Sequence, residues 1–174
     1  MRGVSRRQAL QGLAFAAFAG SATVARSEGA RWLPWPAKRA TPLPEMADVD
    51  GAPWTLAQHA GKPVLLNFWA SWCEPCRAEM QSFVTLEKHF EGLGLKVVAV
   101  NFKESADTVR RFRDANALPF VWLRDSYGEV ARAWGVHTFP TSVLLDRKGR
   151  ALLRVEGEVD WADAAVHKRL AALL

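Results

Sequence analysis

The feature that most constrains this chain is the run Asn-Phe-Trp-Ala-Ser-Trp-Cys-Glu-Pro-Cys-Arg at residues 67–77, where an apolar segment leads directly into a Cys-x-x-Cys pair. The apolar segment, residues 64–69, has the composition of a central strand that is buried on both faces. The helical pattern of residues 77–91 places Cys73 at about the first helical position and Cys76 one turn later. Residues three apart share a helix face, so the two sulfurs, the only ones from cysteine in the chain, can close a disulfide.

The position of Cys73 at the start of a helix determines the chemistry that we expect of it. The N-terminus of a helix carries a partial positive charge, which favours the thiolate over the thiol. The thiolate is the species that attacks a disulfide. Pro75 fits this position, because the first turn of a helix has no internal acceptor for the N–H that proline lacks.

A Cys-x-x-Cys pair can also form half of a zinc site, which needs two further ligands at a comparable spacing. The chain has no second cysteine pair, and its four histidines are scattered singly. We therefore expect a redox dithiol without a metal, and no cofactor apart from the reversible disulfide between Cys73 and Cys76.

Residues 67–77 resemble the active-site segment of the thioredoxin superfamily, and within it that of the exported TlpA/ResA-like thiol-disulfide oxidoreductases, a group of redoxins. The resemblance extends from about Leu43 to the C-terminus. Plain thioredoxins usually carry an Asp where this chain has Asn67, so the buried acid of that position is absent here.

The loop Thr138-Phe139-Pro140-Thr141 resembles the cis-proline loop of the same family. In the family this loop lies against the two sulfurs, and its backbone receives the substrate chain. X-Pro bonds are mostly trans, and a proline often merely starts a strand, but the resemblance implies a cis bond before Pro140. The residues that it places in contact with substrate are Trp72, Glu74, Pro75, Phe139 and Pro140.

The rest of the pattern predicts an α/β domain in which helices flank a central mixed sheet, and the resemblance implies that its fold is thioredoxin-like. The expected strands lie at residues 95–101, 120–123, 142–145 and 151–155, and the expected helices at 106–116 after a Ser105 cap, at 127–134, and after an Asp160 cap in a segment carrying Trp161. The long interval between Cys76 and Pro140 leaves room for an extra strand–helix unit. By resemblance, that insertion marks the TlpA/ResA-like and peroxiredoxin-like branches.

The N-terminal part predicts a signal segment at residues 1–25 and a proline-rich linker at residues 26–42, followed by the thioredoxin-like domain at residues 43–174. The signal segment has a basic start, a short apolar run and small residues near its end. Residues 5–10, Ser-Arg-Arg-Gln-Ala-Leu, resemble a twin-arginine export signal. An alternative to the linker is that the tryptophans at positions 32 and 35 dock on the domain or at a membrane surface.

We accordingly expect a periplasmic or otherwise exported protein, soluble after signal cleavage, or tethered to the membrane if the signal is retained. Disulfides persist in such compartments. The formal net charge of +5 does not indicate nucleic-acid binding, because three of the 23 basic residues lie within residues 1–25, where there is no acid. The remainder has 20 basic and 18 acidic residues, a net charge of +2, which is ordinary for one globular domain. We expect this domain to be a monomer.

Residues 98–105 resemble the family's strand that ends in Asn-x-x-Glu-Ser, whose Glu lies near the cysteine pair. The resemblance implies that Glu104 is catalytic, as a carboxylate that disfavours thiolate and can take up a proton. The alternative is an exposed acid just ahead of a helix, where acids are common.

A negative group beside Cys73, such as Glu74, raises the pKa of the thiol and makes the couple a better reductant. We therefore expect a reductase of protein disulfides in which Cys73 attacks and Cys76 resolves. By resemblance its substrates are the haem-site cysteines of apocytochrome c in cytochrome c biogenesis or the thiols of copper-site assembly factors. A membrane thiol-disulfide carrier would then return electrons to the oxidised protein.

Two other functions are weighed against this one. A peroxiredoxin would need a Thr at the position of Ala70 in its Pro-x-x-x-Thr-x-x-Cys motif. A copper chaperone of thioredoxin fold, which is not an enzyme, uses two cysteines with three residues between them and a distant His. Here only two residues separate the cysteines, and His137 is the one histidine close to the Pro140 loop.

Overall fold

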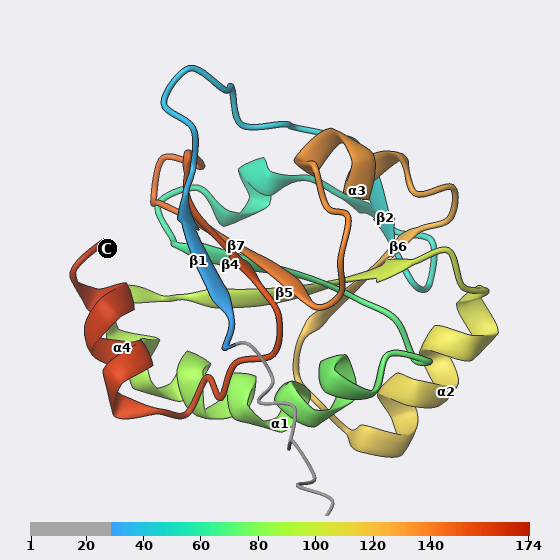
Figure 1. Ribbon diagram of the computed structural model, residues 1–174. Helices are drawn as coiled ribbons and strands as arrows, with labels where there is room; N and C mark the ends of the chain where they lie inside the picture. Colours follow the sequence, from blue (N-terminus) through green and yellow to red (C-terminus); the bar gives the residue numbers. More distant parts are fainter. Residues whose placement is uncertain (1–28) are drawn as a thin grey trace, which may run out of the picture.

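The computed structural model describes residues 29–174, and the predicted signal segment at residues 1–25 lies outside the described residues. The centre of the described part is an eight-stranded mixed sheet with the strand order β1-β8-β7-β4-β5-β6-β2-β3 (Figure 1). The strands are β1 (Arg31–Pro34), β2 (Met46–Asp48), β3 (Pro53–Trp54), β4 (Val64–Trp69), β5 (Lys96–Phe102), β6 (Val121–Asp125), β7 (Thr141–Leu145) and β8 (Ala151–Glu156). The helices are η1 (Leu56–His59), α1 (Glu74–His89), η2 (Glu91–Leu93), α2 (Ala106–Asn116), α3 (Glu129–Trp134) and α4 (Ala164–Ala171).

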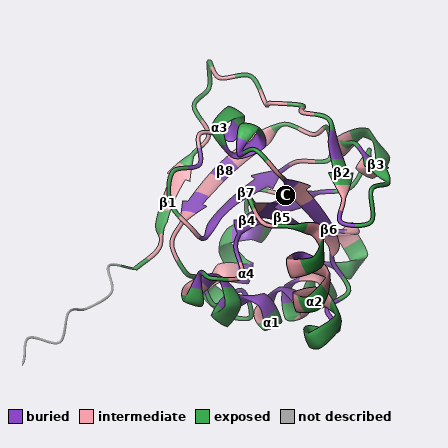
Figure 2. Cartoon of the chain, turned by 90° about the vertical axis from the view of Figure 1, so that its right-hand side faces the viewer, coloured by how far each residue is buried: buried purple, intermediate pink, exposed green. Residues whose placement is uncertain are grey.

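Strand β4 is the central strand, paired in parallel with β5 and antiparallel with β7. All six of its residues are buried, as the apolar run predicts (Figure 2). Side chains alternate between the two faces of a strand. Leu65 and Trp69 therefore belong to the core on one face of the sheet, and Leu66 and Phe68 belong to the core on the other.

Helices cover both faces of this sheet. Helices α1, α2 and α4 lie on one face, and α3 lies on the other (Figure 1). Phe83 of α1, Val109 of α2 and Leu170 of α4 pack into the same core as Trp69, whereas Trp134 of α3 packs into the core that contains Phe68. The predicted thioredoxin-like fold with a mixed sheet flanked by helices is confirmed.

The predicted insertion is also present. Two strand–helix units, β5–α2 and β6–α3, lie between α1 and β7. Helix α2 begins as expected at Ser105, whose hydroxyl accepts a hydrogen bond of 3.2 Å from the backbone N–H of Thr108.

The starts of the other three predicted helices differ from the structure, and α3 begins at Glu129 rather than at residue 127. Helix α1 begins at Glu74, and Cys73 is its N-cap rather than its first helical residue. The last helix is not capped by Asp160, and Trp161 precedes it. Its cap is Asp163, whose Oδ1 accepts a hydrogen bond of 2.6 Å from the backbone N–H of Ala165. Asp160 instead accepts a hydrogen bond of 3.0 Å from the backbone N–H of Ala162, in the turn that precedes the helix.

The prediction of a linker at residues 26–42 is wrong for residues 31–34, which form β1 and pair with β8 at the sheet edge. The alternative, in which both tryptophans dock on the domain, is the one that the structure shows. Trp32 packs on Trp161 at a centroid distance of 6.0 Å, and Trp35 packs on Trp134 at 5.5 Å. The prolines do not prevent this pairing, because an edge strand tolerates the loss of a backbone donor.

Candidate active site

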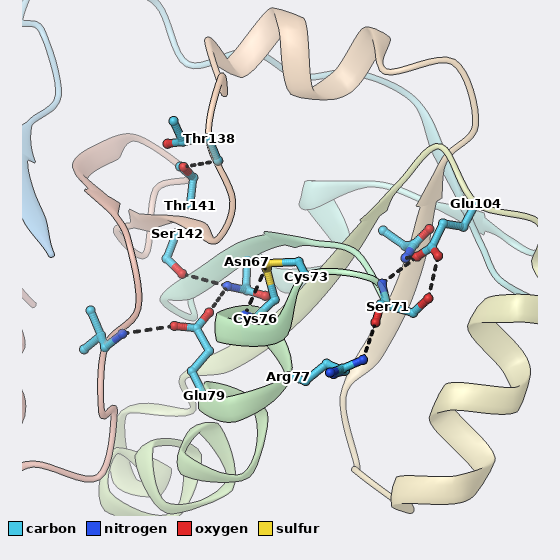
Figure 3. The surroundings of a disulfide bond; sticks show 12 residues. Asn67, Ser71, Cys73, Cys76, Arg77, Glu79, Glu104, Thr138, Thr141 and Ser142 are labelled. Carbon is cyan, nitrogen blue, oxygen red and sulfur yellow. Dashed lines mark hydrogen bonds between the residues drawn. A yellow bond between two sulfur atoms is a disulfide. The ribbon is translucent and has the colours of Figure 1, made fainter. Parts of the chain in front are cut away.

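The cysteine pair lies where β4 ends and α1 begins, as the sequence predicts. Cys73 and Cys76 form a disulfide with a Cα–Cα distance of 5.3 Å (Figure 3). The sulfur of Cys73 also caps α1, because it accepts a hydrogen bond of 3.3 Å from the backbone N–H of Cys76. Cys73 is 5% exposed and Cys76 is fully buried, so Cys73 is the cysteine that solvent reaches.

A buried carboxyl group lies one turn beyond the disulfide on the same face of α1. Glu79 is 2% exposed, and its Oε1 accepts a hydrogen bond of 2.7 Å from the side-chain amide of Asn67 (Figure 3). Its Oε2 accepts bonds of 3.2 Å from the backbone N–H of Val159 and from the indole N–H of Trp161. The Asn67 amide also donates to the hydroxyl of Ser142 at 3.1 Å.

Burial raises the pKa of Glu79 to about 8, because removal from water penalises the charged form. The three N–H donors, from Val159, Trp161 and Asn67, act in the opposite direction and favour the carboxylate, whereas the charge of Glu158 adds to the rise. A carboxyl group with a pKa close to neutral can exchange a proton at physiological pH.

Sequence reasoning missed Glu79. Position 67 holds Asn, so the buried acid of that position is absent, and the resemblance points to Glu104 as the carboxylate near the cysteine pair. The signal that could have found it is helical periodicity, because Glu79 lies three residues after Cys76 on the stripe that continues through Phe83 and Leu86. A Glu on a buried stripe requires polar partners from elsewhere in the fold.

The structure places Glu104 beside the active-site loop, but not in hydrogen-bonding contact with the sulfurs. One carboxylate oxygen accepts hydrogen bonds from the backbone N–H of Ser71 at 2.7 Å and from the side chain of Asn101 at 2.6 Å. The other accepts a bond of 2.5 Å from the hydroxyl of Ser71. In Figure 3, Glu104 and Ser71 lie to one side of the disulfide, and Glu79 and Ser142 lie to the other. Glu104 therefore fixes the loop that leads to Cys73.

The loop before β7 has the form that the resemblance implies. The Phe139–Pro140 peptide bond is cis. The hydroxyl of Thr141 donates to the carbonyl of Thr138 at 2.8 Å, and the carbonyl of Pro140 accepts a bond of 2.9 Å from the N–H of Gly157. Two hydrogen bonds thus hold the loop in place next to β7 and β8.

The residues predicted to contact substrate come together in part around this loop. Trp72 is 63% exposed, and its ring meets that of Phe139 edge to face with a centroid distance of 6.0 Å. Glu74 is exposed, Pro75 is half-buried and Pro140 is buried.

Within residues 29–174, no group of three or more His, Cys, Asp or Glu side chains lies close enough together to hold a metal ion. His137 is exposed on the surface. In the same described part, no helix has the length and apolar character that crossing a membrane requires.

Known proteins resemble this chain over the domain that carries the disulfide. The profile of the AhpC/TSA family matches residues 37–151. Thiol-disulfide oxidoreductase ResA of Geobacillus thermodenitrificans is 32% identical over 122 residues, which cover 70% of this chain and 70% of the relative. ResA of Bacillus subtilis is 35% identical over 112 residues, which cover 64% of this chain and 63% of the relative.

Solved structures agree with these relatives. A crystal structure from Chlorobium tepidum, assigned as the thiol:disulfide interchange protein DsbE, superposes with a TM-score of 0.69 at 30% sequence identity. The superposition covers 76% of this chain and 94% of the other. The pair of cysteines, the carboxyl group of Glu79 and the cis-proline loop lie within residues 37–151, the part of the chain that the family profile matches.

Proposed function

Because the chain belongs to the AhpC/TSA family and is a thiol-disulfide oxidoreductase of the ResA and DsbE type, we propose that it acts as a reductase of protein disulfides. The observation that carries this proposal is the buried carboxyl group of Glu79, one turn beyond Cys76. A carboxyl and a thiol buried on one helix face cannot both ionise cheaply, so the reduced protein is not stabilised as a thiolate. A couple whose reduced form lacks this stabilisation is a reductant.

The charges next to the cysteine pair also favour a reducing couple. Glu74 is exposed directly after Cys73, where its charge disfavours the thiolate. The guanidinium of Arg77 is directed to the carbonyl of Ser71, with a hydrogen bond of 3.0 Å. A strongly oxidising couple needs the opposite arrangement, with positive groups that stabilise the thiolate.

The proposed reaction has two steps. The thiolate of Cys73 attacks one sulfur of the substrate disulfide, that disulfide breaks, and the departing substrate sulfur takes up a proton. Cys76 then gives its proton to the carboxylate of Glu79 and attacks the sulfur of Cys73, and the second substrate sulfur leaves as a thiolate. Both departing substrate sulfurs take their protons from water, and Glu79 afterwards returns its proton to water. The substrate gains two electrons and two protons, and the protein ends as the Cys73–Cys76 disulfide that the structure contains.

Glu104 has a different role in this proposal from the one that the sequence suggests. Both of its oxygens already accept hydrogen bonds from Ser71 and Asn101. We propose that Glu104 is a positioning residue, which acts on Cys73 through the Ser71 loop. Direct proton transfer between Glu104 and a cysteine remains the alternative that mutagenesis can distinguish.

The setting of the reaction is part of the proposal. The basic and apolar pattern of residues 1–25 supports export, with the domain working in the periplasm or another exported compartment. The proposed substrates are protein disulfides of the kind found at the haem-site cysteines of apocytochrome c or in copper-site assembly factors. A membrane thiol-disulfide carrier would re-reduce a monomeric protein.

A peroxidase function has less support, although the matching family profile is that of AhpC/TSA proteins. Ala70 stands where the peroxiredoxin motif needs Thr, and Ala70 is completely buried. It therefore offers no hydroxyl to a peroxide at Cys73.

Two measurements test the proposed function. The first traps the substrate, since a Cys76→Ala variant produced in the native compartment should retain its substrate in a mixed disulfide with Cys73. A Cys73→Ala variant is the control and should trap nothing. The second is the equilibrium potential against glutathione or dithiothreitol, which should lie well below about −180 mV. A potential above that value would show that the protein is not a reductase.

A further inference from the structure

Three aromatic side chains, two from loops and one from the end of β5, form a continuous row beside the reactive cysteine. Trp72 contacts Phe139 at a centroid distance of 6.0 Å, and Phe139 contacts Phe102 at 4.8 Å. We call Trp72, Phe139 and Phe102 the aromatic row. Trp72 is among the few large apolar side chains of the described residues that remain well exposed. Phe139 and Phe102 are half-buried, so the three rings together form a continuous, partly exposed apolar patch. Such a patch beside a reacting atom indicates an interaction surface.

The row ends at a positive charge, the ammonium group of Lys103. Its Nζ lies 5.1 Å from the centroid of the Phe102 ring. The group forms no ion pair with any residue in the 29–174 range. It is therefore available to a negatively charged group of a partner.

The backbone holds Lys103 in an unusual conformation. Its φ angle is 56°, in the left-handed region that residues other than glycine rarely adopt. The N–H of Lys103 donates to the carbonyl of Asp125 at 3.0 Å. This conformation allows the two residues on either side of Lys103 to point to different partners. Phe102 lies against Phe139, and the carboxylate of Glu104 faces Ser71. Such conformations cluster at functional sites.

The loop that follows β6 closes against the same two side chains. Gly128 lies so close to Phe102 and Lys103 that a Cβ atom at this position would collide with both. The glycine thus permits a close approach that keeps the Lys103 side chain along the Phe102 ring. The row and its terminal charge are consequently a preformed surface.

We propose that the aromatic row and Lys103 form a docking surface that selects protein substrates with an apolar side chain close to the target cysteine and an acidic side chain further along. This inference rests on the proposed function, because it takes a polypeptide disulfide as the substrate. The apolar side chain packs on the row, and the acidic one pairs with Lys103. Docking is non-covalent and precedes the attack by Cys73.

The dimensions of the surface set the spacing of the two substrate side chains. The two centroid distances place Phe102 at most about 11 Å from Trp72. The Nζ atom of Lys103 lies 5.1 Å from the Phe102 centroid, and so at most about 16 Å from Trp72. An extended chain advances about 3.3 Å per residue. The acidic side chain should therefore lie about three to five residues from the cysteine that is attacked.

Synthetic peptides with one intramolecular disulfide test the surface. The first peptide carries Leu next to one of its two cysteines and Asp four residues from that same cysteine. The second has Lys in place of Asp, and the third has Ala in place of Leu. The protein is reduced with dithiothreitol, which is then removed, and single-turnover rates of peptide reduction are measured at low and high salt.

We expect the Asp peptide to be reduced about fivefold faster than the Lys peptide at low salt, and the difference to shrink at high salt. Lys103→Asn should bring the ratio close to one, and Lys103→Asp should invert it. Asn and Asp have nearly the same shape, and both tolerate the left-handed conformation, so charge alone differs between the two variants. Phe102→Ala should remove most of the preference for Leu over Ala.

Lys148→Asp provides the matched control. Lys148 lies in the turn between β7 and β8, at the end of the sheet opposite to Cys73, because Leu145 pairs with Val64 and Thr141 pairs with Phe68. This variant makes the same change of charge and should keep the wild-type ratio.

The outcomes separate the two proposals. Equal rates with all three peptides, or a preference that the Lys103 and Phe102 variants leave unchanged, would overturn the docking surface while the proposed function stands. Reduction of hydroxyethyl disulfide without reduction of any peptide would overturn the proposed function and the docking surface together.

Discussion

The side-chain amide of Asn67 on β4 donates a hydrogen bond of 2.7 Å to the carboxyl group of Glu79 on α1, in a part of the core that excludes water. Plain thioredoxins carry an acid at the strand position, whereas in this chain the strand supplies the amide and the facing helix supplies the acid. The other amide atom, Asn67 Oδ1, is buried and has no hydrogen-bond partner among the described residues. If the amide rotates, this oxygen can accept a hydrogen bond from protonated Glu79. The Asn67 side chain can therefore form a hydrogen bond with Glu79 whether its carboxyl group is charged or neutral.

The first prediction concerns catalysis by Glu79. Glu79→Gln removes the group that takes the proton of Cys76, so resolution of the mixed disulfide should slow by about tenfold or more. The wild-type rate should rise as the pH passes through about 8, the pKa of Glu79, and the variant should lack that rise. Stopped-flow tryptophan fluorescence between pH 5 and 10 measures both. Superimposable pH profiles would remove Glu79 from the reaction.

The second prediction uses the same variant to test stability. The pKa of Glu79 is raised from 4.5 to about 8 on folding, so the folded protein binds a proton that the unfolded chain releases above pH 4.5. The stabilisation is fully present below about pH 4.5 and is lost as the pH rises to about 8, by an amount on the order of a few kcal/mol. Gln has no charge to bury, and its amide can donate to Asn67 Oδ1.

Urea unfolding of the oxidised protein between pH 4 and 9 measures this dependence. We expect the free energy of unfolding of the wild type to fall across this range and that of Glu79→Gln to change much less. A wild-type curve that is flat, or that rises with pH, would contradict the raised pKa.

The third prediction separates the two roles of Glu104. If Glu104 acts by holding the loop, Glu104→Gln leaves an amide facing N–H and O–H donors from Ser71 and Asn101, and should lower stability by about 1–3 kcal/mol. Ser71→Ala should then slow reduction to a similar extent. The double variant should be no slower than either single variant, because both changes disturb the same contact. Alkylation rates across pH report the cysteine pKa values. A lowered cysteine pKa with unchanged stability would show instead that Glu104 acts directly on the sulfurs.

The fourth prediction contrasts two tryptophans. Trp32 of β1 packs against Trp161, and the guanidinium of Arg169 lies 4.3 Å above its ring. Trp32→Ala should therefore lower the free energy of unfolding by about 2 kcal/mol and leave the reduction of small disulfides nearly unchanged. Trp72→Ala, at an exposed position, should do the reverse, with stability within about 0.5 kcal/mol of wild type and slower reduction of peptides. Urea unfolding measures the stability of each variant, and the peptide assay measures its reduction rate.

The fifth prediction concerns export. Residues 1–25, fused to a reporter that is active only when it is exported in the folded state, should direct its export. Replacing Arg6 and Arg7 by Lys should abolish the signal, because both arginines belong to the twin-arginine pattern. Unchanged export of the variant would indicate the ordinary secretory route.

The sequence by itself determined the features that depend on neighbouring residues. The buried strand, the cysteine pair at the start of a helix and the Ser105 cap follow from periodicity and capping within a few positions, and the structure agrees with each. The mixed sheet followed from the alternation of such elements. The cis peptide bond before Pro140 followed from the resemblance of its loop to that of a known family.

Only the tertiary structure decided which distant groups meet. Glu79 became the buried acid because Asn67 and Trp161, from β4 and from the segment before α4, supply its N–H donors. Glu104 turned toward Ser71 because the left-handed backbone at Lys103 redirects the chain. These contacts depend on packing between segments that are far apart in the sequence. Local periodicity places each residue on a face of its own element, but it does not specify which side chain of another element lies opposite.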